Sequence, residues 1–278
     1  MSADVVVVIG AGGIGQAIAR RQGPGRTVLL ADRSEHILAA AKDILEAGGH
    51  TVVARQVDVS TRETVRGLAR TAAGLGPVVN VVNTAGLSPV QASPAAILAV
   101  DLVGTALVFE EFEAVIAPGG AGLVISSMAG HMPPPLDLET ARLLGHTPAD
   151  ELLSLPILSE QAVPSPGAAY GLSKQANHAR AQAAAVTWGE RGARVNSLSP
   201  GIVLTPLARD EMSGPGAAGY QQMISTSAAG RVGTVDEIAA AAAFLLGPDA
   251  AFITGTDLLI DGGVVAALRA GRWNLTPA

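Results

Sequence analysis

The sequence predicts an α/β protein: a doubly wound parallel sheet with helices on both faces, formed by a single domain over residues 1–278. Short apolar runs rich in Val, Ile and Leu alternate with amphipathic stretches along almost the whole chain, which is typical of parallel strands joined by helices. A glycine-rich turn, Gly10–Gly15, links the first apolar run to the first helical stretch. No internal repeat or low-complexity linker divides the chain, which favours one domain.

Composition narrows the function classes. About half of the residues (49%) are hydrophobic and 15% are charged, with a net charge of −6 and no basic tract. This balance allows a large core and argues against nucleic acid or a membrane as partner. The chain has no Cys, so neither a disulfide framework nor a thiolate metal site is expected, and we predict no metal site. The first apolar run passes directly into glycines and is interpreted as a strand, not a leader, so we expect a cytoplasmic protein.

The first half of the chain is expected to contain four strands and three helices. The strands are predicted from apolar, β-branched runs of the kind that is buried on both faces of a parallel sheet. The expected strands are Val5–Ile9, Val28–Ala31, Thr51–Val57 and Val78–Val82. The expected helices cover 16–21, a stretch from the N-cap Ser34 to Gly48, and 61–73.

The second half continues the pattern but contains one segment of different texture. Residues 131–165 hold three consecutive prolines and two probable short helices, at about 137–144 and 148–154. This segment is predicted to be a helical insertion in the single domain. Around it we expect a helix over Pro94–Ile116, strand Leu123–Ile125, a helix from about Tyr170 to Gly189, strand Arg194–Leu198, helices near 206–212, 217–227 and 235–246, strand Asp257–Ile260 and a tail.

The pattern Gly10-x-Gly12-x-x-Gly15 stands between a strand and a helix, and Asp32 ends the next strand about twenty residues on. This arrangement is typical of a dinucleotide site, where glycines let the backbone approach a pyrophosphate at a helix N-terminus. Asp32 could accept hydrogen bonds from ribose hydroxyls, which favours NAD over NADP. Arg33 could instead serve a 2′-phosphate. A tight turn with a capping Asp is the alternative without a ligand.

Two further strand ends carry polar or small residues. Asp58 ends the third strand and could reach an adenine amino group, or it could only cap the strand. Asn83-Thr-Ala-Gly86 follows the fourth strand with small residues that suit close approach of a cofactor.

Tyr170 and Lys174 are one helical turn apart, in a chain that has only two Tyr and two Lys. On a helix the phenol and the ammonium would share one face, where the cation stabilises the phenolate. Lys can also join a proton relay, which Arg cannot. The alternative is a solvent-facing Lys beside a half-buried Tyr.

Six motifs stand together in a recognisable order: Gly13-Ile-Gly15, Asn83-Thr-Ala-Gly86, Ser126-Ser127, Tyr170-Gly-Leu-Ser-Lys174, Pro200-Gly-Ile-Val-Leu-Thr205 and Asp261-Gly-Gly263. In this order the chain resembles the short-chain dehydrogenase/reductase family from residue 5 to about 263, apart from 131–165. The resemblance implies a Rossmann fold and an NAD(P)-dependent enzyme that acts on CH–OH groups by hydride transfer.

The resemblance also implies site roles. Tyr170 would be the general acid/base at the substrate oxygen, Ser127 would hydrogen-bond that oxygen, and Lys174 would bind the nicotinamide ribose. Thr205 and the Val203 backbone would hold the carboxamide. The implied cofactor-binding set is Gly10, Gly12, Gly13, Ile14, Gly15, Asp32, Arg33, Asp58, Val59, Asn83, Ala85, Gly86, Tyr170, Lys174, Pro200, Gly201, Val203 and Thr205.

Three departures from the family pattern stand out. The family's usual opening, Thr-Gly-x-x-x-Gly-x-Gly, is Val8-Ile-Gly-Ala-Gly-Gly-Ile-Gly15 here, so the internal hydrogen bonding of the loop must differ. Asp101 lies where many members carry an Asn that holds a relay water, and it is added to the catalytic set. It could pair with Lys174 and keep the ammonium charged, or it could be only a structural polar group. In addition, Tyr170 follows Ser127 by 43 positions, where typical members have about a dozen.

The segment 131–165 fills that gap and is expected to form part of the substrate site or a subunit interface, with a tolerated surface excursion as the alternative. Its layout is similar to that of the bacterial 3α-hydroxysteroid dehydrogenase/carbonyl reductase branch. That similarity implies a hydroxysteroid or other apolar carbonyl substrate and a homodimer or homotetramer. His131 opens the segment and could face substrate or be only solvated.

The sequence therefore predicts an oxidoreductase that transfers a hydride between NAD(H) and a secondary alcohol or ketone. Substrate binding would be completed by the segment 131–165 and by the segment 206–227, which could close as a lid. The alternative is a non-catalytic dinucleotide-binding sensor with the same fold. Such a protein would usually have lost the Tyr or the Lys, and both are present here.

Overall fold

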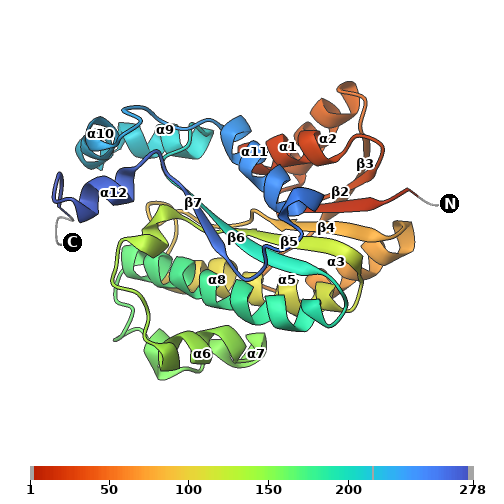
Figure 1. Cartoon of the computed structure of the whole chain (residues 1–278), viewed down its shortest axis with the longest axis horizontal. Coiled ribbons are helices and arrows are strands. Elements are labelled where there is room, and N and C mark those ends of the chain that lie inside the picture. The colour runs from red at the N-terminus through yellow and green to blue at the C-terminus, as the bar shows by residue number, and fades with distance from the viewer. Residues whose placement is uncertain (1–2, 215, 275–278) are drawn as a thin grey trace.

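A computed structural model describes residues 3–214 and 216–274. Its centre is a seven-stranded parallel sheet with the order β3-β2-β1-β4-β5-β6-β7 (Figure 1). The order runs outwards in both directions from β1 and β4, so the prediction of a doubly wound sheet is confirmed. The strands are β1 Val5–Ile9, β2 Thr27–Asp32, β3 Thr51–Gln56, β4 Val78–Asn83, β5 Ile116–Ile125, β6 Arg194–Pro200 and β7 Asp257–Ile260.

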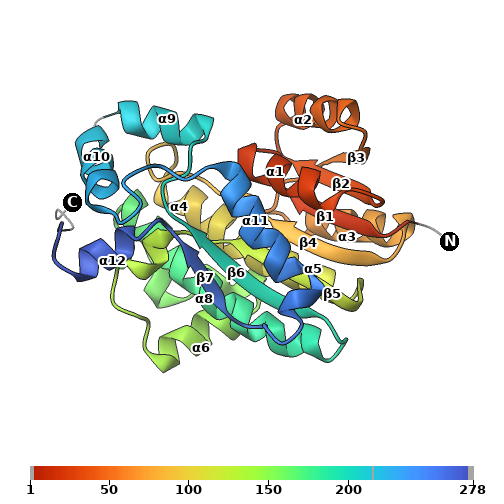
Figure 2. The same cartoon turned by 45° about the horizontal axis from the view of Figure 1, so that its top comes forward.

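Helices cover both faces of this sheet. One face carries α1 (Gly13–Gln22), α2 (Glu35–Ala47) and α11 (Val235–Leu246), and the other carries α3 (Arg62–Leu75), α5 (Gly104–Glu113) and α8 (Pro166–Gly189), as Figures 1 and 2 show. The remaining helices are α4 Pro94–Ile97, α6 Leu138–His146, α7 Ala149–Leu152, α9 Pro206–Ser213, α10 Ala217–Thr226 and α12 Val264–Arg269. Short turns of other helix types are η1 Leu98–Val103, η2 Met128–His131, η3 Pro156–Leu158 and η4 Pro248–Ala250.

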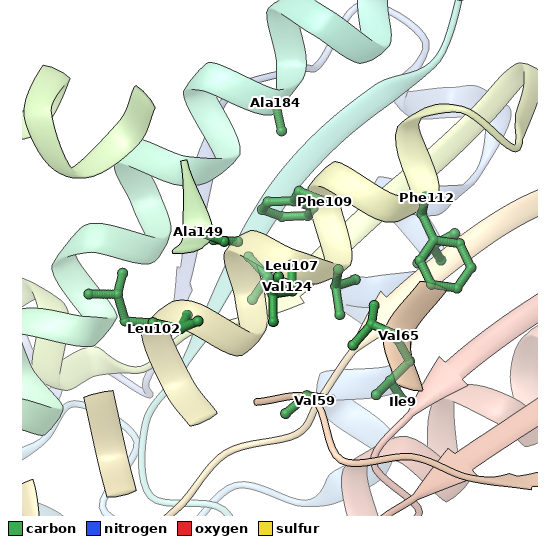
Figure 3. Packing of buried hydrophobic residues seen from close by; sticks show 14 of the residues in the cluster. Ile9, Val59, Val65, Leu102, Leu107, Phe109, Phe112, Val124, Ala149 and Ala184 are labelled. Carbon is green, nitrogen blue, oxygen red and sulfur yellow. The ribbon is translucent and has the colours of Figure 1, made fainter. Parts of the chain in front are cut away.

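The first strand shows why an unbroken apolar run forms the centre of the sheet. Successive side chains of a strand point to opposite faces. Val5, Val7 and Ile9 enter the cluster beneath α3 and α5, while Val6 and Val8 enter the cluster beneath α2. All five are at most 1% exposed. Figure 3 shows the first of these clusters, with Ile9, Val65 and Phe112 packed together.

The long helix expected over Pro94–Ile116 differs from the prediction in two ways. It ends at Glu113, and its middle turn, Leu98–Val103, is π-helical. Ile116 instead begins β5, because it pairs with Val78 of β4. The register then shifts to Asn80 opposite Ala121, so the residues between form an irregularity that lengthens β5 beyond the expected strand. The tail also forms a helix, α12, that the sequence did not predict.

Residues 131–165 fold as α6, α7 and η3 and lie against α8 on the side away from the sheet (Figures 1 and 2). Their apolar side chains enter the main core, with Leu144 and Leu152 fully buried. Arg62 of α3 contacts Asp150 of the insertion at 2.9 Å and also contacts Glu110 and Glu111 of α5. The insertion is therefore integrated into the domain by packing and charge.

Candidate active site

The glycine loop after β1 has the shape that a phosphate group needs. Gly10 has a φ of +99°, and a Cβ there would lie 2.3 Å from the Thr84 hydroxyl. A Cβ at Gly15 would lie 1.9 Å from the Gly10 carbonyl oxygen, so α1 and the loop touch backbone to backbone. A Cβ at Gly12, in contrast, would meet no atom within 4 Å. The loop is thus closed towards the protein and open at the N-terminus of α1, which fits a dinucleotide pyrophosphate.

Asp32 lies beside this loop at the end of β2. Its carboxylate accepts hydrogen bonds from the backbone N–H groups of Ala11 and Ser34, both at 2.8 Å. These two bonds hold the carboxylate in one orientation. The position fits a group that reads ribose hydroxyls, since an oxygen of an ionised carboxylate has more than one lone pair.

Arg33 and Asp58 form a pair at the neighbouring strand ends. The Arg33 side chain is 76% exposed, and its Nε lies 3.9 Å from the Asp58 carboxylate. Asp58 also accepts from the N–H of Ser60 at 3.0 Å and from its hydroxyl at 2.6 Å. Burial raises the pKa of Asp58, but the Ser60 hydrogen bonds and Arg33 together lower it below its ordinary value. Asp58 is therefore held ionised.

Several residues of the predicted cofactor set have side chains that shape the loops. The Asn83 amide oxygen accepts from the N–H of Ala85 at 3.2 Å, and the Thr84 hydroxyl donates to the Ile9 and Gly10 carbonyls at 3.0 Å. These bonds tie the end of β4 to the end of β1. The Val59 side chain is buried against Gly104, where a Cβ would approach it to 2.8 Å.

A cavity of about 520 Å³ opens where the strands end at their carboxyl termini. Predicted residues in its wall are Ile14, Gly86, Asp101, Ser127, Tyr170, Lys174, Pro200, Gly201, Val203 and Thr205. Predicted residues outside its wall are Gly10, Gly12, Gly13, Gly15, Asp32, Arg33, Asp58, Val59, Asn83 and Ala85. The structure thus brings the four predicted catalytic residues together, while the glycine loop, Asp32 and Asp58 lie towards β1–β3.

Lys174 and Asp101 form a buried ion pair in this cavity. Lys174 is 4% exposed and Asp101 is fully buried, with 2.9 Å between Nζ and Oδ2. The Lys174 Nζ also lies 5.1 Å from the centre of the Tyr170 ring. Burial acts to lower the pKa of Lys174, but the charges of Asp101 and Tyr170 raise it above its ordinary value. The ammonium therefore stays charged under the phenol, and the predicted pairing of Lys174 with Asp101 is present.

Asp101 reaches this position from the π-helical turn Leu98–Val103. Its other carboxylate oxygen accepts from the N–H of Leu87 at 2.8 Å, which fixes the loop after β4. Single π turns inside α-helices are common at functional sites. Gly86 completes the fit, since a Cβ there would approach the Asp101 carboxylate to 3.1 Å and the Lys174 Nζ to 3.4 Å.

The two serines that end β5 have different surroundings. Ser126 is buried and its hydroxyl donates to the carbonyl of Lys174 at 2.9 Å, which attaches α8 to the end of β5. Ser127 is half-buried, and its hydroxyl accepts from the N–H of Ala129 at 3.2 Å. Ser127 therefore keeps its hydroxyl hydrogen for a ligand in the cavity, as expected for the second serine of the pair.

The rest of the wall contains residues that no sequence motif identified, although several of them lie in the segment 206–227, which is expected from the sequence to complete the substrate site. They are Met128, Met132, Tyr220, Gln222, Met223, Trp273 and Asn274, among others. Methionines offered a weak signal, because all four that follow Met1 fall between residues 128 and 223. Trp273 offered none, since no motif surrounds it. From the insertion 131–165, Met132 alone is in the wall. His131 does not line the wall, and its ring contacts Asp257 instead. It therefore neither faces the cavity nor is only solvated, which were the two expectations for it.

Comparison with known proteins agrees with these features. Residues 4–137 match the family described as "short chain dehydrogenase", and residues 151–265 match the one described as "Enoyl-(Acyl carrier protein) reductase". The chain is 42% identical over 269 residues to short-chain dehydrogenase/reductase bsc3 of Alternaria brassicicola, over 96% of this chain and 98% of the relative. The chain belongs to the short-chain dehydrogenase/reductase family. It is thus an NAD(P)-dependent oxidoreductase that acts on CH–OH groups.

Other relatives of this dehydrogenase/reductase have different named substrates. Galactitol 2-dehydrogenase (L-tagatose-forming) of Cereibacter sphaeroides is 31% identical over 92% of both chains. The 3-alpha-hydroxysteroid dehydrogenase/carbonyl reductase of Comamonas testosteroni is 28% identical over 87% of this chain and 97% of the relative. A solved short-chain dehydrogenase/reductase from Serratia marcescens superposes with a TM-score of 0.73 at 25% identity, over 95% of this chain and 98% of that one. Within the described residues, no helix is long and apolar enough to cross a membrane.

Proposed function

We propose that this enzyme interconverts a secondary alcohol and its ketone with NAD(H), on a substrate that is apolar around the reacting carbon, such as a hydroxysteroid. The observation that carries the proposal is the buried Lys174–Asp101 pair beneath Tyr170, in one cavity with Ser127. When bound, NAD(H) supplies or accepts the hydride.

The side chains handle the proton and the charge on the substrate oxygen. The Tyr170 hydroxyl gives a proton to the oxygen when the ketone is reduced and takes it back when the alcohol is oxidised. Ser127 donates a hydrogen bond to the same oxygen and orients it. The ammonium of Lys174, kept charged by Asp101 at 2.9 Å, stabilises the phenolate that forms on Tyr170.

The wall of the cavity supports the proposed substrate class. Three methionines (Met128, Met132 and Met223) and Trp273 face the space beside the catalytic set. Thioether side chains are apolar and adapt their shape to a ligand. This lining supports an apolar alcohol or ketone better than a polyol such as galactitol, whose hydroxyls need several polar partners.

Preference for NAD over NADP is supported by Asp32 and Arg33. A carboxylate beside the ribose repels a 2′-phosphate, and the Nε of Arg33 lies 3.9 Å from the Asp58 carboxylate. We expect kcat/KM with NAD to exceed that with NADP by about tenfold or more, measured on one substrate. Asp32→Ala should reduce the ratio of kcat/KM with NAD to kcat/KM with NADP, and Arg33→Ala should leave the preference for NAD in place. Equal use of both cofactors by the wild-type enzyme would contradict the assignment.

Replacement of the predicted acid/base tests the catalytic role. Tyr170→Phe should lower kcat by about 10²–10⁴-fold, because the proton donor is lost, while NAD binding and the melting temperature change little. Tyr220→Phe is the matched control, since Tyr220 is the second Tyr of the chain and lines the same cavity. It should keep kcat within a few-fold. Turnover retained in Tyr170→Phe would disprove the assignment.

The non-catalytic sensor is the second reading and is not favoured, because Tyr170, Lys174 and Ser127 are all present in one cavity. The homodimer or homotetramer and the cytoplasmic location stay predictions. A role of the segment 131–165 at the substrate site or at a subunit interface also stays a prediction. The position of Met132 in the cavity wall supports a role at the substrate site.

A further inference from the structure

Two histidines and an aspartate meet outside the cavity wall, at the edge of the sheet formed by β7. His131 ends η2, His178 lies on α8, and Asp257 is the first residue of β7. The His131 Nε2 is 2.7 Å from one carboxylate oxygen of Asp257, and the His178 Nε2 is 3.3 Å from the other. In the part of the chain that the structure describes, these three are the one group of His, Cys, Asp or Glu side chains that converges closely enough to hold a metal ion.

The carboxylate at the centre of this group is held in place. Hydroxyls of Ser197 and Ser199, on the neighbouring strand β6, donate to one oxygen of Asp257 at 2.6 and 2.9 Å. Hydrogen bonds of this kind orient the carboxylates of metal sites. The site is also sheltered without being closed, because the three side chains are 22%, 19% and 10% exposed for His131, His178 and Asp257.

The donor atoms match one kind of ion. Imidazole nitrogens with a carboxylate oxygen suit Zn²⁺ and similar divalent transition metals, whereas Mg²⁺ and Ca²⁺ prefer oxygen ligands. Ligands about 2.0–2.2 Å from a tetrahedral zinc are about 3.3 Å apart. The His178 Nε2 lies 3.3 Å from one Asp257 oxygen and the His131 Nε2 lies 2.7 Å from the other. All three ligand atoms lie within 4.8 Å of one another, so small shifts would bring them to this spacing around one ion. Three protein ligands leave one position for water or another ligand.

We propose that His131, His178 and Asp257 bind one divalent transition metal ion, with Zn²⁺ as the preferred ion. The lack of Cys excludes a thiolate site and does not exclude this one. The site is separate from the reaction, since none of its three ligands lines the cavity.

Metal bound here would connect the elements that carry the catalytic residues. His178 is one helical turn beyond Lys174 on α8, and His131 closes the turn that begins after Ser127. An ion shared by both with Asp257 would fix the position of η2 relative to α8 and β7. If the metal ion binds the folded chain and not the unfolded chain, it must also raise the stability of the fold, by an amount that depends on the metal concentration.

The test is metal titration of the full chain after removal of bound ions with a chelator. We expect one Zn²⁺ per chain by competition with a zinc-binding dye, and a melting temperature that rises by several degrees in excess Zn²⁺. Co²⁺ should give the visible absorption of a tetrahedral nitrogen and oxygen site. His131→Asn and Asp257→Asn should each weaken Zn²⁺ binding at least about tenfold.

His36→Asn is the matched control, because His36 is an exposed histidine on α2, outside the group. It should leave affinity and stoichiometry unchanged. A wild-type chain that binds no Zn²⁺ at one equivalent would overturn the proposal. Equal loss of binding in the His36 variant would also overturn it, because the ion would then be held elsewhere. Because His131 is partly exposed at the end of a short turn, its variant is expected to fold, and its circular dichroism and NAD binding verify this.

Discussion

The insertion 131–165 and the segment that contains α9 and α10 (206–226) both lie outside the sheet and its covering helices, but they are built in opposite ways. The insertion buries Leu144 and Leu152 completely and is linked to α3 by the Arg62–Asp150 ion pair. Helix α10 has no buried residue and no charged residue. Yet α10 contributes Tyr220, Gln222 and Met223 to the cavity wall, and the insertion contributes only Met132.

The two segments are therefore expected to have different tasks, which a sequence pattern does not distinguish. A long insertion next to a catalytic residue suggests control of substrate choice. Here Leu144, Leu152 and Leu158 of the insertion pack into the main core, while α10, which has no buried residue, supplies part of the cavity wall. Segments that bind ligands are often drawn from the less stable parts of a protein. We therefore expect stability to depend on the insertion and substrate choice to depend on α10.

Truncation of a buried leucine in the insertion should have the largest effect on stability. Leu152 is fully buried, so Leu152→Ala should lower the free energy of unfolding by about 2–5 kcal/mol. KM should change by less than about twofold at a temperature where the variant is folded, because Leu152 is outside the cavity wall. The measurements are urea unfolding and steady-state kinetics.

The neighbouring residue gives a matched control. Leu153 is 51% exposed, so Leu153→Ala should change the free energy of unfolding by no more than about 0.5 kcal/mol. If Leu152→Ala altered the substrate profile as much as the stability, the separation of the two tasks would be wrong.

The opposite result is expected on α10. Met223→Ala removes a partly buried side chain from the cavity wall and should lower kcat/KM for an apolar ketone by about tenfold, since the substrate loses apolar contact. The free energy of unfolding should fall by less than about 1 kcal/mol. Met223→Leu, which nearly conserves volume, should recover most of the activity. A Met223→Ala enzyme with wild-type kcat/KM across an apolar panel would show that α10 does not contact the substrate.

Acid should lower the stability of the region where α3 and α5 contact the insertion, because this region is held by ion pairs. The effect should be smaller than that of Leu152→Ala. The Arg66 hydrogen bond lowers the pKa of Glu111 against the opposing effect of burial, and Arg62 lowers it further. A carboxyl with a lowered folded-state pKa adds stability above its unfolded value, near 4.5, and loses it as the pH falls through the lowered value. Arg66→Gln should lower the free energy of unfolding at pH 7 and make that free energy less dependent on pH between pH 5 and 3.

Urea unfolding over this pH range measures the effect. The control is Arg70→Gln, a change at an exposed position on the same helix, which should keep the wild-type pH dependence. An unchanged pH profile in Arg66→Gln would mean that Glu111 is not stabilised by this pair.

Features that depend on local pattern could be predicted from the sequence. The fully apolar β-branched runs indicated strands buried on both faces, and the glycine spacing before Asp32 located the loop because only glycine fits its closed side. The Tyr170 and Lys174 pair followed from helical spacing, and their common cavity with Asp101 and Ser127 is present in the structure.

Features that depend on contacts between distant segments could not be predicted from the sequence. The π turn at Asp101 contacts the loop after β4, where the Asp101 carboxylate accepts a hydrogen bond from the N–H of Leu87. Trp273 reaches the cavity because α12 folds back, with its indole N–H donating to the Val264 carbonyl at 3.2 Å. The His131, His178 and Asp257 group joins three elements that are far apart in sequence.

The composition of α10 has a consequence for how such an enzyme can change over generations. Because no residue of α10 is buried, substitutions there remove little of the packing that holds the sheet and its helices together. Most substitutions that a protein fails to tolerate are lost through instability. Substitutions in α10 are expected to cause little loss of stability. A lineage can therefore acquire new substrates through this helix while its catalytic residues and its stability stay the same.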